Sequence, residues 1–143
     1  MMSQRRESTL LYLIKRVEMA LRRQLDEVVE AAGITAVQYA ALTSLEWQPN
    51  LTAAALARHS FVTAQTTAQL VRGLEQRGLI ERHPDPKSRR QVLLALTPEG
   101  IALLDELRGP VAEIERRMTD GLGPSELERV RNVLESLRAA AEA

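Results

Sequence analysis

The sequence contains no cysteine among its 143 residues. A disulfide framework, a thiolate metal site and a thiol redox switch are therefore excluded. The sequence also lacks any run of 18 apolar residues, so we expect no membrane-spanning helix. No apolar signal core follows the polar start Met1–Glu7. From the absence of cysteine, a reduced cytoplasmic setting is the expectation.

An excess of charge of either sign is missing as well, because 19 Lys and Arg residues balance 19 Asp and Glu residues. Taken alone, a net charge of zero argues against a nucleic acid as the partner. The distribution along the chain argues the other way. The segment 72–90 holds six basic and three acidic residues, whereas the segment 91–143 holds six basic and ten acidic ones. Either one face of the protein meets an anion, or solvated charges cluster here by chance.

The features of an enzyme are also scarce. His59 and His83 are the only histidines and lie in different segments, so we expect no metal site and no catalytic constellation. A glycine-rich phosphate loop and a nucleophile motif are both missing, and no cofactor is expected. A content of 45% hydrophobic and 27% charged residues is typical of a compact domain rather than of a disordered chain.

Apolar residues recur at helical spacing from the start of the chain. The first stripe covers about Thr9–Ala32 and ends at Gly33, a typical helix-terminating residue. The pair Thr35 and Gln38 fits a capping box. This capping box predicts a second helix that continues to about Trp47.

The middle of the chain combines two further helices with a change of pattern. A short alanine-rich helix is expected over 53–59, and a longer one over 64–77 with Thr63 as its N-cap. Two short apolar strands, 79–83 and 91–96, then surround a cluster of turn-forming residues. The middle of the chain is therefore predicted to form a short helix, a turn, a helix and a β-hairpin with a basic tip.

Helical spacing returns after the hairpin. The sequence Thr97-Pro98-Glu99 combines a capping hydroxyl, a proline at the first helical position and an acid in the first turn. Gly109-Pro110 should kink this helix or split it into two abutting helices, and Pro124 begins the last helix. Apolar residues in both segments follow the 3-4 spacing of helix bundles. These seams serve either a dimer or packing within one subunit.

The predicted order is that of a winged helix-turn-helix, so the fold class is mainly α with a small β-hairpin wing (α+β). In such a unit the second helix lies in the DNA major groove, and a hairpin directly after it can reach the neighbouring minor groove. The helix over 64–77 has suitable faces. The residues expected to face inward are Ala64, Thr67, Leu70, Val71 and Leu74. The candidates for base-edge contacts are Gln65, Thr66 and Gln69, and those for phosphate contacts are Thr63 and Arg72.

At these positions the sequence resembles the MarR family of bacterial transcription regulators. Leu74–Ile80 (LEQRGLI) resembles the end of the family's recognition helix. Asp85–Arg90 (DPKSRR) and Leu94–Gly100 (LALTPEG) resemble its wing signature, an Asp-Pro-x-Asp-Arg-Arg turn that leads to Leu-Thr-x-x-Gly. One position departs, because Ser88 stands where the family usually has aspartate.

The resemblance covers nearly the whole chain and implies one MarR-like domain, 1–143. Within it, 34–100 would form the DNA-binding lobe, and 8–33 and 101–143 the dimerisation helices. The implied function is that of a transcription repressor that binds a palindromic operator in double-stranded DNA as a homodimer. The alternative is a winged-helix architectural or protein-interaction module without operator specificity. A small helical enzyme has little support.

The resemblance also implies two further sets of residues. At the wing, Arg89 and Arg90 are the candidates for the minor groove, and Lys87 and Arg82 are candidates for phosphates. Relatives often bind a small aromatic or phenolic effector in a cleft between the dimer helices and the lobe. The candidates for lining such a cleft are Tyr12, Tyr39 and Trp47, which otherwise are core or interface side chains. The lack of cysteine argues against the peroxide-sensing branch of the family.

Overall fold

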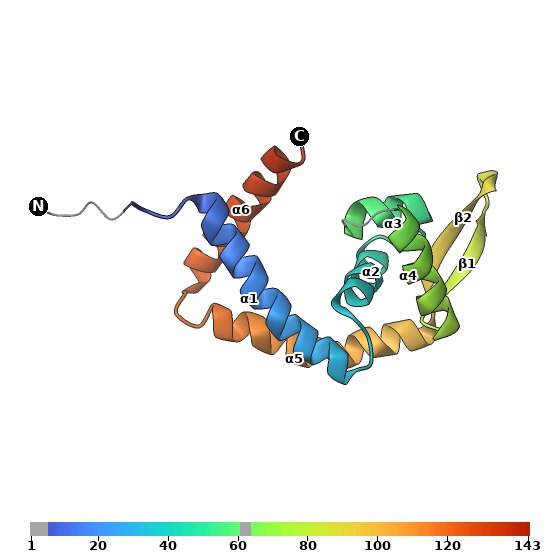
Figure 1. Cartoon of the computed structure of the whole chain (residues 1–143), viewed down its shortest axis with the longest axis horizontal. Coiled ribbons are helices and arrows are strands. Elements are labelled where there is room, and N and C mark those ends of the chain that lie inside the picture. The colour runs from blue at the N-terminus through green and yellow to red at the C-terminus, as the bar shows by residue number, and fades with distance from the viewer. Residues whose placement is uncertain (1–5, 61–63) are drawn as a thin grey trace, which may run out of the picture. The chain divides into compact units, whose positions relative to one another are not determined.

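The computed structural model describes residues 6–60 and 64–143 (Figure 1). Its elements confirm the predicted fold class, helices with one antiparallel hairpin. Contacts divide the chain into one compact unit that ends at Val111 and a second unit, Ala112–Ala143. In chain order, the elements are α1 (Leu10–Ala31), α2 (Ala36–Trp47), α3 (Ala53–Ser60), α4 (Ala64–Gln76), β1 (Ile80–Asp85), β2 (Ser88–Leu96), α5 (Pro98–Met118) and α6 (Pro124–Ala141).

The junction of α1 and α2 follows the predicted capping pattern. Gly33 has a φ of +82°, a conformation that glycine adopts without strain, and α1 ends just before it. The Thr35 hydroxyl accepts a hydrogen bond from the Gln38 N–H (3.1 Å), and the Gln38 side chain accepts one from the Thr35 N–H (2.9 Å). This reciprocal pair is the predicted capping box. The guanidinium of Arg77, directly after α4, donates to the Gly33 carbonyl and so joins the ends of α1 and α4.

The core of the first unit lies where α2, α3 and α4 meet the hairpin. Figure 1 shows α3 and α4 beside each other, with the hairpin next to α4. The large side chains buried in this core include residues of α2 (Leu42, Leu45), α3 (Leu56), α4 (Val71, Leu74) and β2 (Leu94). Leu104 and Leu107 of α5 extend the same cluster. Burial of these aliphatic side chains positions α4 with its opposite face toward solvent.

The hairpin extends further toward its tip than the sequence predicted. Asp85 pairs with Ser88 around the two-residue turn Pro86-Lys87, and the Asp85 carboxylate accepts a hydrogen bond from the Lys87 N–H (2.9 Å). An aspartate that accepts from the backbone two residues later stabilises a tight turn. Of the four residues 85–88 predicted as a turn-forming cluster, Pro86 and Lys87 form the turn, whereas Asp85 and Ser88 belong to the strands. Near the base of the hairpin, the Leu94 N–H donates to the Leu51 carbonyl (2.7 Å), which attaches the α2–α3 connection to β2.

The base of the hairpin and the start of α5 are joined by backbone contacts around Thr97. Its hydroxyl donates to the Gly78 carbonyl (2.5 Å) and accepts from the Gly100 N–H (3.1 Å), while its own N–H donates to the Leu79 carbonyl (3.1 Å). Gly100 approaches Leu79 so closely that a Cβ atom at this position would lie 2.2 Å from the Leu79 carbonyl oxygen. The junction therefore requires glycine at position 100.

We expect the substitution Gly100→Ala to lower the free energy of unfolding by roughly 1–3 kcal/mol, the usual cost of overpacking. The Leu79 carbonyl is a backbone group and already accepts the Thr97 N–H, so it cannot move without shifting β1. The matched control is Gly109→Ala in the same helix, where an added Cβ meets nothing within 4 Å and alanine favours the helix. Urea unfolding measures both variants. Equal midpoints for the two variants would contradict the prediction.

Helix α5 corrects one expectation from the sequence. It runs without a break over Pro98–Met118 with Pro110 inside it, so the prediction of two abutting helices is wrong. Proline removes one helical hydrogen bond, and the residue whose carbonyl would have accepted it, Glu106, is exposed to water. Two residues before Pro110, Arg108 donates to Glu46 of α2 (Nη1–Oε1, 3.3 Å). This hydrogen bond raises the pKa of the Arg108 guanidinium above its ordinary value.

Two helices carry apolar side chains that their own unit leaves in water. On α1 these are Leu10, Leu11, Tyr12, Leu13, Ile14, Val17 and Met19. Helix α6, which lies wholly within the described residues, buries none of its side chains and exposes Val130, Val133, Leu134 and Leu137.

Within the described residues no single helix is long and apolar enough to cross a membrane, and only α1 and α2, bent by 88°, pass that test as a pair on length and composition.

Candidate nucleic-acid interface

Helix α4 has one buried face and one exposed polar face. Thr67, Leu70, Val71 and Leu74 are all buried, with at most 8% exposure, which confirms their predicted inward position; the side chain of Ala64 lies outside the described part. The exposed side chains of the helix include Gln65, Thr66, Gln69 and Arg72, as predicted. Positions 65, 69 and 72 follow the helical repeat, so their side chains share one face. This face can enter the DNA major groove.

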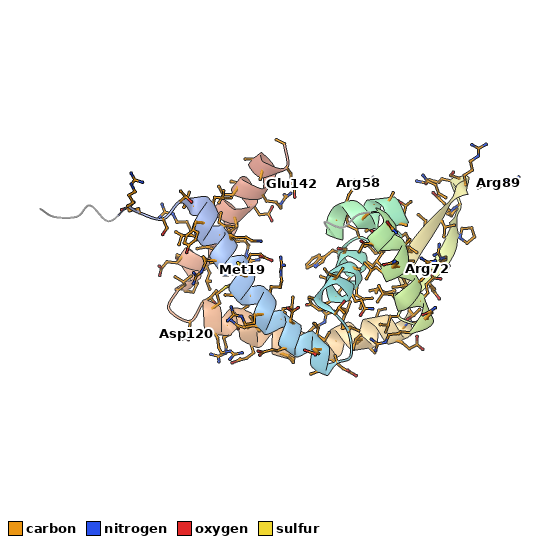
Figure 2. The ribbon with its side chains drawn as sticks, viewed as in Figure 1. Met19, Arg58, Arg72, Arg89, Asp120 and Glu142 are labelled. Atoms are coloured by element: carbon orange, nitrogen blue, oxygen red, sulfur yellow. The ribbon has the colours of Figure 1, made fainter. Side chains whose placement is uncertain are left out.

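The same region is free of acidic residues. No Asp or Glu occurs in the sequence between Glu46 and Glu75, a stretch that includes all of α3 and most of α4. The exposed cations of these helices include Arg58 on α3 and Arg72 on α4, which are labelled in Figure 2. Carboxylates that would repel DNA phosphates are therefore missing from α3 and from α4 as far as Leu74.

The structure separates the six cations of segment 72–90 into two groups. Two have partners inside the protein: Arg77 donates to the Gly33 carbonyl, and Arg82 forms an ion pair with Glu75 (Nε–Oε1, 2.7 Å). Within residues 6–60 and 64–143, the side chains of the other four form no hydrogen bond or ion pair. These four are Arg72, Lys87, Arg89 and Arg90. All four were predicted as DNA contacts, whereas Arg82, a further candidate for phosphates, is paired with Glu75.

Arg89 and Arg90 lie at the tip of the hairpin, where the strand pairing is irregular. Pro84 pairs with Val92 and the next residue, Asp85, pairs with Ser88, so residues 89–91 of β2 have no partner on β1. Such a bulge redirects side chains away from the regular alternation of a strand. Both arginines are exposed, and Figure 2 shows Arg89 at the tip. The tip therefore presents guanidinium groups at the end of a narrow hairpin, a shape that fits a minor groove.

The remaining predicted residues have more varied positions. Thr63, predicted as an N-cap and a phosphate contact, lies outside the described residues. Tyr39 is half-buried against the core, whereas Tyr12 is exposed and its hydroxyl accepts from Arg16 (3.4 Å). Trp47 is 79% exposed. Within the described ranges no ring contact joins these aromatic side chains, so an effector cleft lined by them stays a prediction.

Two other features complete the inventory of possible sites. A shallow depression runs along α6 and is lined by residues such as Ser125, Arg129 and Val133. In the part of the chain that is described, no group of three or more His, Asp or Glu side chains could hold a metal ion. The sequence analysis did not predict the ion pair between Arg82 and Glu75. The available signal was that Glu75 is the one acid in the sequence of α4.

The fold and the exposed helix with its neighbouring basic hairpin define the class, that of winged helix-turn-helix DNA-binding proteins. The model of the MarR family matches residues 34–92. An HTH-type transcriptional repressor of Mycobacterium tuberculosis is 30% identical over 126 residues, which are 88% of this chain and 91% of that protein. The protein therefore belongs to the MarR family and is a transcription regulator with a DNA-binding winged helix.

Solved structures agree with this family. The chain is similar to apo MarR of E. coli with a TM-score of 0.79 and 26% identity, covering 92% of this chain and 98% of that one. It is similar to MepR of S. aureus, in a structure of its DNA complex, with a TM-score of 0.78 and 27% identity, covering 94% and 99%. Both likenesses extend over nearly the entire chain, so they include the helices outside the winged unit.

Proposed function

We propose that the protein is a repressor that binds a palindromic operator as a homodimer in the cytoplasm. The observation that carries the proposal is the combination of an exposed polar face on α4, without an acid before Glu75, with four cations that have no partner within the described residues. A helix of this kind reads base edges in the major groove, and a basic hairpin tip fits the adjacent minor groove. Repression, rather than activation, is proposed because the similar protein of M. tuberculosis is a transcriptional repressor.

Individual side chains have distinct roles in this proposal. Gln65 and Gln69 are the candidates for base contacts, because an amide can form a bidentate pair with adenine; Thr66 lies on the same exposed side. Arg72, with Thr63 near the helix start, holds phosphates. Arg89 and Arg90 supply the guanidinium that enters the minor groove, and Lys87 adds a phosphate contact.

A homodimer is proposed because of the apolar side chains exposed on α1 and α6. Seven on α1 and four on α6 are among the large hydrophobic side chains in contact with water. Contiguous apolar surface of this kind marks a protein interface. A two-fold dimer then presents two α4 helices to half-sites about one helical turn, roughly 34 Å, apart.

A small aromatic or phenolic effector completes the proposal, with Tyr12, Tyr39 and Trp47 as candidate contacts. Such a ligand would favour a spacing of the two lobes that does not fit the operator. It must then weaken DNA binding by the coupling free energy between the two sites, typically 1–3 kcal/mol. Trp47 is the only tryptophan and is exposed, so its fluorescence should change when a hydroxybenzoate binds. An operator affinity that stays constant at saturating hydroxybenzoate would rule that ligand out as an effector.

Selection of bound duplexes from a random pool tests the function directly. We expect enrichment of a palindrome with two half-sites about one helical turn apart. We also expect the logarithm of its affinity to fall with the logarithm of salt by about 0.9 for each phosphate contact. Random duplex serves as the control at each salt concentration. A pool that remains unenriched would contradict the proposal and favour a module without operator specificity.

A further inference from the structure

The ion pair between Glu75 and Arg82 joins the two elements of the proposed DNA-binding surface. Glu75 lies in the last turn of α4 and Arg82 is the third residue of β1. The Arg82 Nε lies 2.7 Å from the Glu75 Oε1, with side-chain exposures of 48% and 30%. Among contacts within the described residues, this is the one side-chain hydrogen bond that connects the hairpin to α4.

Few other contacts hold the part of the hairpin beyond Ile80 near α4. On β1 the only buried side chain is Ile80, and every residue from Glu81 to Pro84 is exposed. Arg82 is separated from Ile80 by one residue and pairs with Leu94 across the sheet. Because alternate residues share a face of a strand, Arg82 lies on the same face as the buried Ile80 and Leu94. Its side chain therefore returns to α4 from the inner face of the hairpin.

We propose that Glu75 and Arg82 are positioning residues that set the place of the wing relative to α4. The inference rests on the proposed function, in which α4 and the hairpin tip contact neighbouring grooves of one operator half-site. The spacing of these grooves is a property of DNA. If the wing can move away from α4, the distance between them no longer matches the distance between the two grooves. An exposed ion pair contributes little to stability, and the role of this pair is to restrict the hairpin.

For the substitution Glu75→Gln, the proposal and simple electrostatics predict opposite changes in operator affinity. Replacing Glu75 by glutamine removes a negative charge near the DNA, which by itself strengthens binding to any duplex. If Glu75 instead positions the wing through Arg82, the same substitution weakens binding to the operator and leaves binding to random duplex unchanged or stronger. The ratio of the two affinities therefore separates positioning from charge.

The test compares full-length variants on the selected operator and on random duplex. We expect Glu75→Gln to lower operator affinity about tenfold. Each subunit of a dimer loses one exposed ion pair, and the combined loss of two such pairs corresponds to about this factor. The matched control is Glu81→Gln, which changes the charge equally. Glu81 pairs with His83 of the same strand (2.8 Å) and joins no second element, so this variant should not lose operator affinity.

Two further measurements sharpen the test. The charge reversal Glu75→Arg with Arg82→Glu should restore most of the operator affinity lost in Arg82→Glu alone, and this comparison also decides the matter if Glu75→Gln does not fold. In hydroxyl-radical footprints, Glu75→Gln should lose protection in the minor groove while methylation protection of major-groove guanines persists.

Each alternative outcome has a definite meaning. Equal operator affinities for Glu75→Gln and Glu81→Gln would overturn the positioning role. A loss in Arg82→Gln without a loss in Glu75→Gln would do the same and would make Arg82 a phosphate contact. If the parent protein itself does not prefer the operator to random duplex, the proposed function fails, and this result is distinct from a failure of the positioning role.

Discussion

The double substitution Arg89→Ala with Arg90→Ala should lower operator affinity about thousandfold. Both side chains are exposed and have no partner within the described residues, so their removal breaks no hydrogen bond or ion pair there. A dimer loses four guanidinium groups, and about 1 kcal/mol for each, the low end of the range for such contacts, gives this factor. Fluorescence anisotropy with the selected operator, at fixed salt, measures the change.

A lysine pair at the same positions is the matched control. Arg89→Lys with Arg90→Lys keeps both charges but replaces the planar guanidinium with a compact, strongly hydrated ammonium. If a guanidinium enters a narrow A·T-rich groove, the lysine variant should retain its affinity for random duplex and lose its preference for A·T-rich flanks. A double alanine variant that binds the operator as the parent does would show that the wing assignment is wrong.

The local elements were predictable because their signals are short-range. The capping box of Thr35 and Gln38, the helix end before Gly33 and the inward face of α4 all depend on residues within one or two turns of each other. The exposed face of α4 followed directly from its buried one. The candidates Gln65 and Gln69 are therefore exposed as the sequence predicted, and their role in DNA contact is still a prediction.

Features that depend on the tertiary structure were not predictable in the same way. The periodic pattern does not show that the Arg82 side chain returns to Glu75, seven residues earlier, because this depends on how the hairpin folds back on α4. The bulge at residues 89–91 depends on the pairing of Asp85 with Ser88. In α5, Pro110 does not end the helix, and the residue whose carbonyl is left without its helical donor, Glu106, is exposed.

The balanced charge of the chain also has a structural explanation. In the segment 72–90, all three acids have partners within the protein: Glu75 binds Arg82, Glu81 binds His83, and Asp85 accepts the Lys87 N–H. The acids therefore stabilise the ends of α4 and the hairpin, while four cations stay available to an anion. A net charge of zero limits nonspecific attraction to DNA, so specificity should depend more on groove contacts and on the dimer.

The second large effect concerns the proposed homodimer. We expect Leu134→Asp on α6 to yield a monomer at concentrations where the parent protein is a dimer. Leu134 is 52% exposed and shares a face with Val130, Val133 and Leu137, so aspartate removes little packing within the chain. In a dimer that buries this face, two carboxylates would lose water without a partner, at a cost of several kcal/mol. Sedimentation velocity measures the change.

Asn132→Asp provides the matched control, because position 132 lies on the opposite side of α6 and receives the same charge. It should stay dimeric and bind the operator as the parent does. Leu134→Asp should keep its helical circular dichroism yet lose more than about a hundredfold in operator affinity, since two half-sites no longer bind one molecule. A Leu134→Asp variant that remained a dimer would exclude this face of α6 from the interface. The exposed apolar side chains of α1 would then be the remaining candidate for the surface that sets the spacing of the two α4 helices.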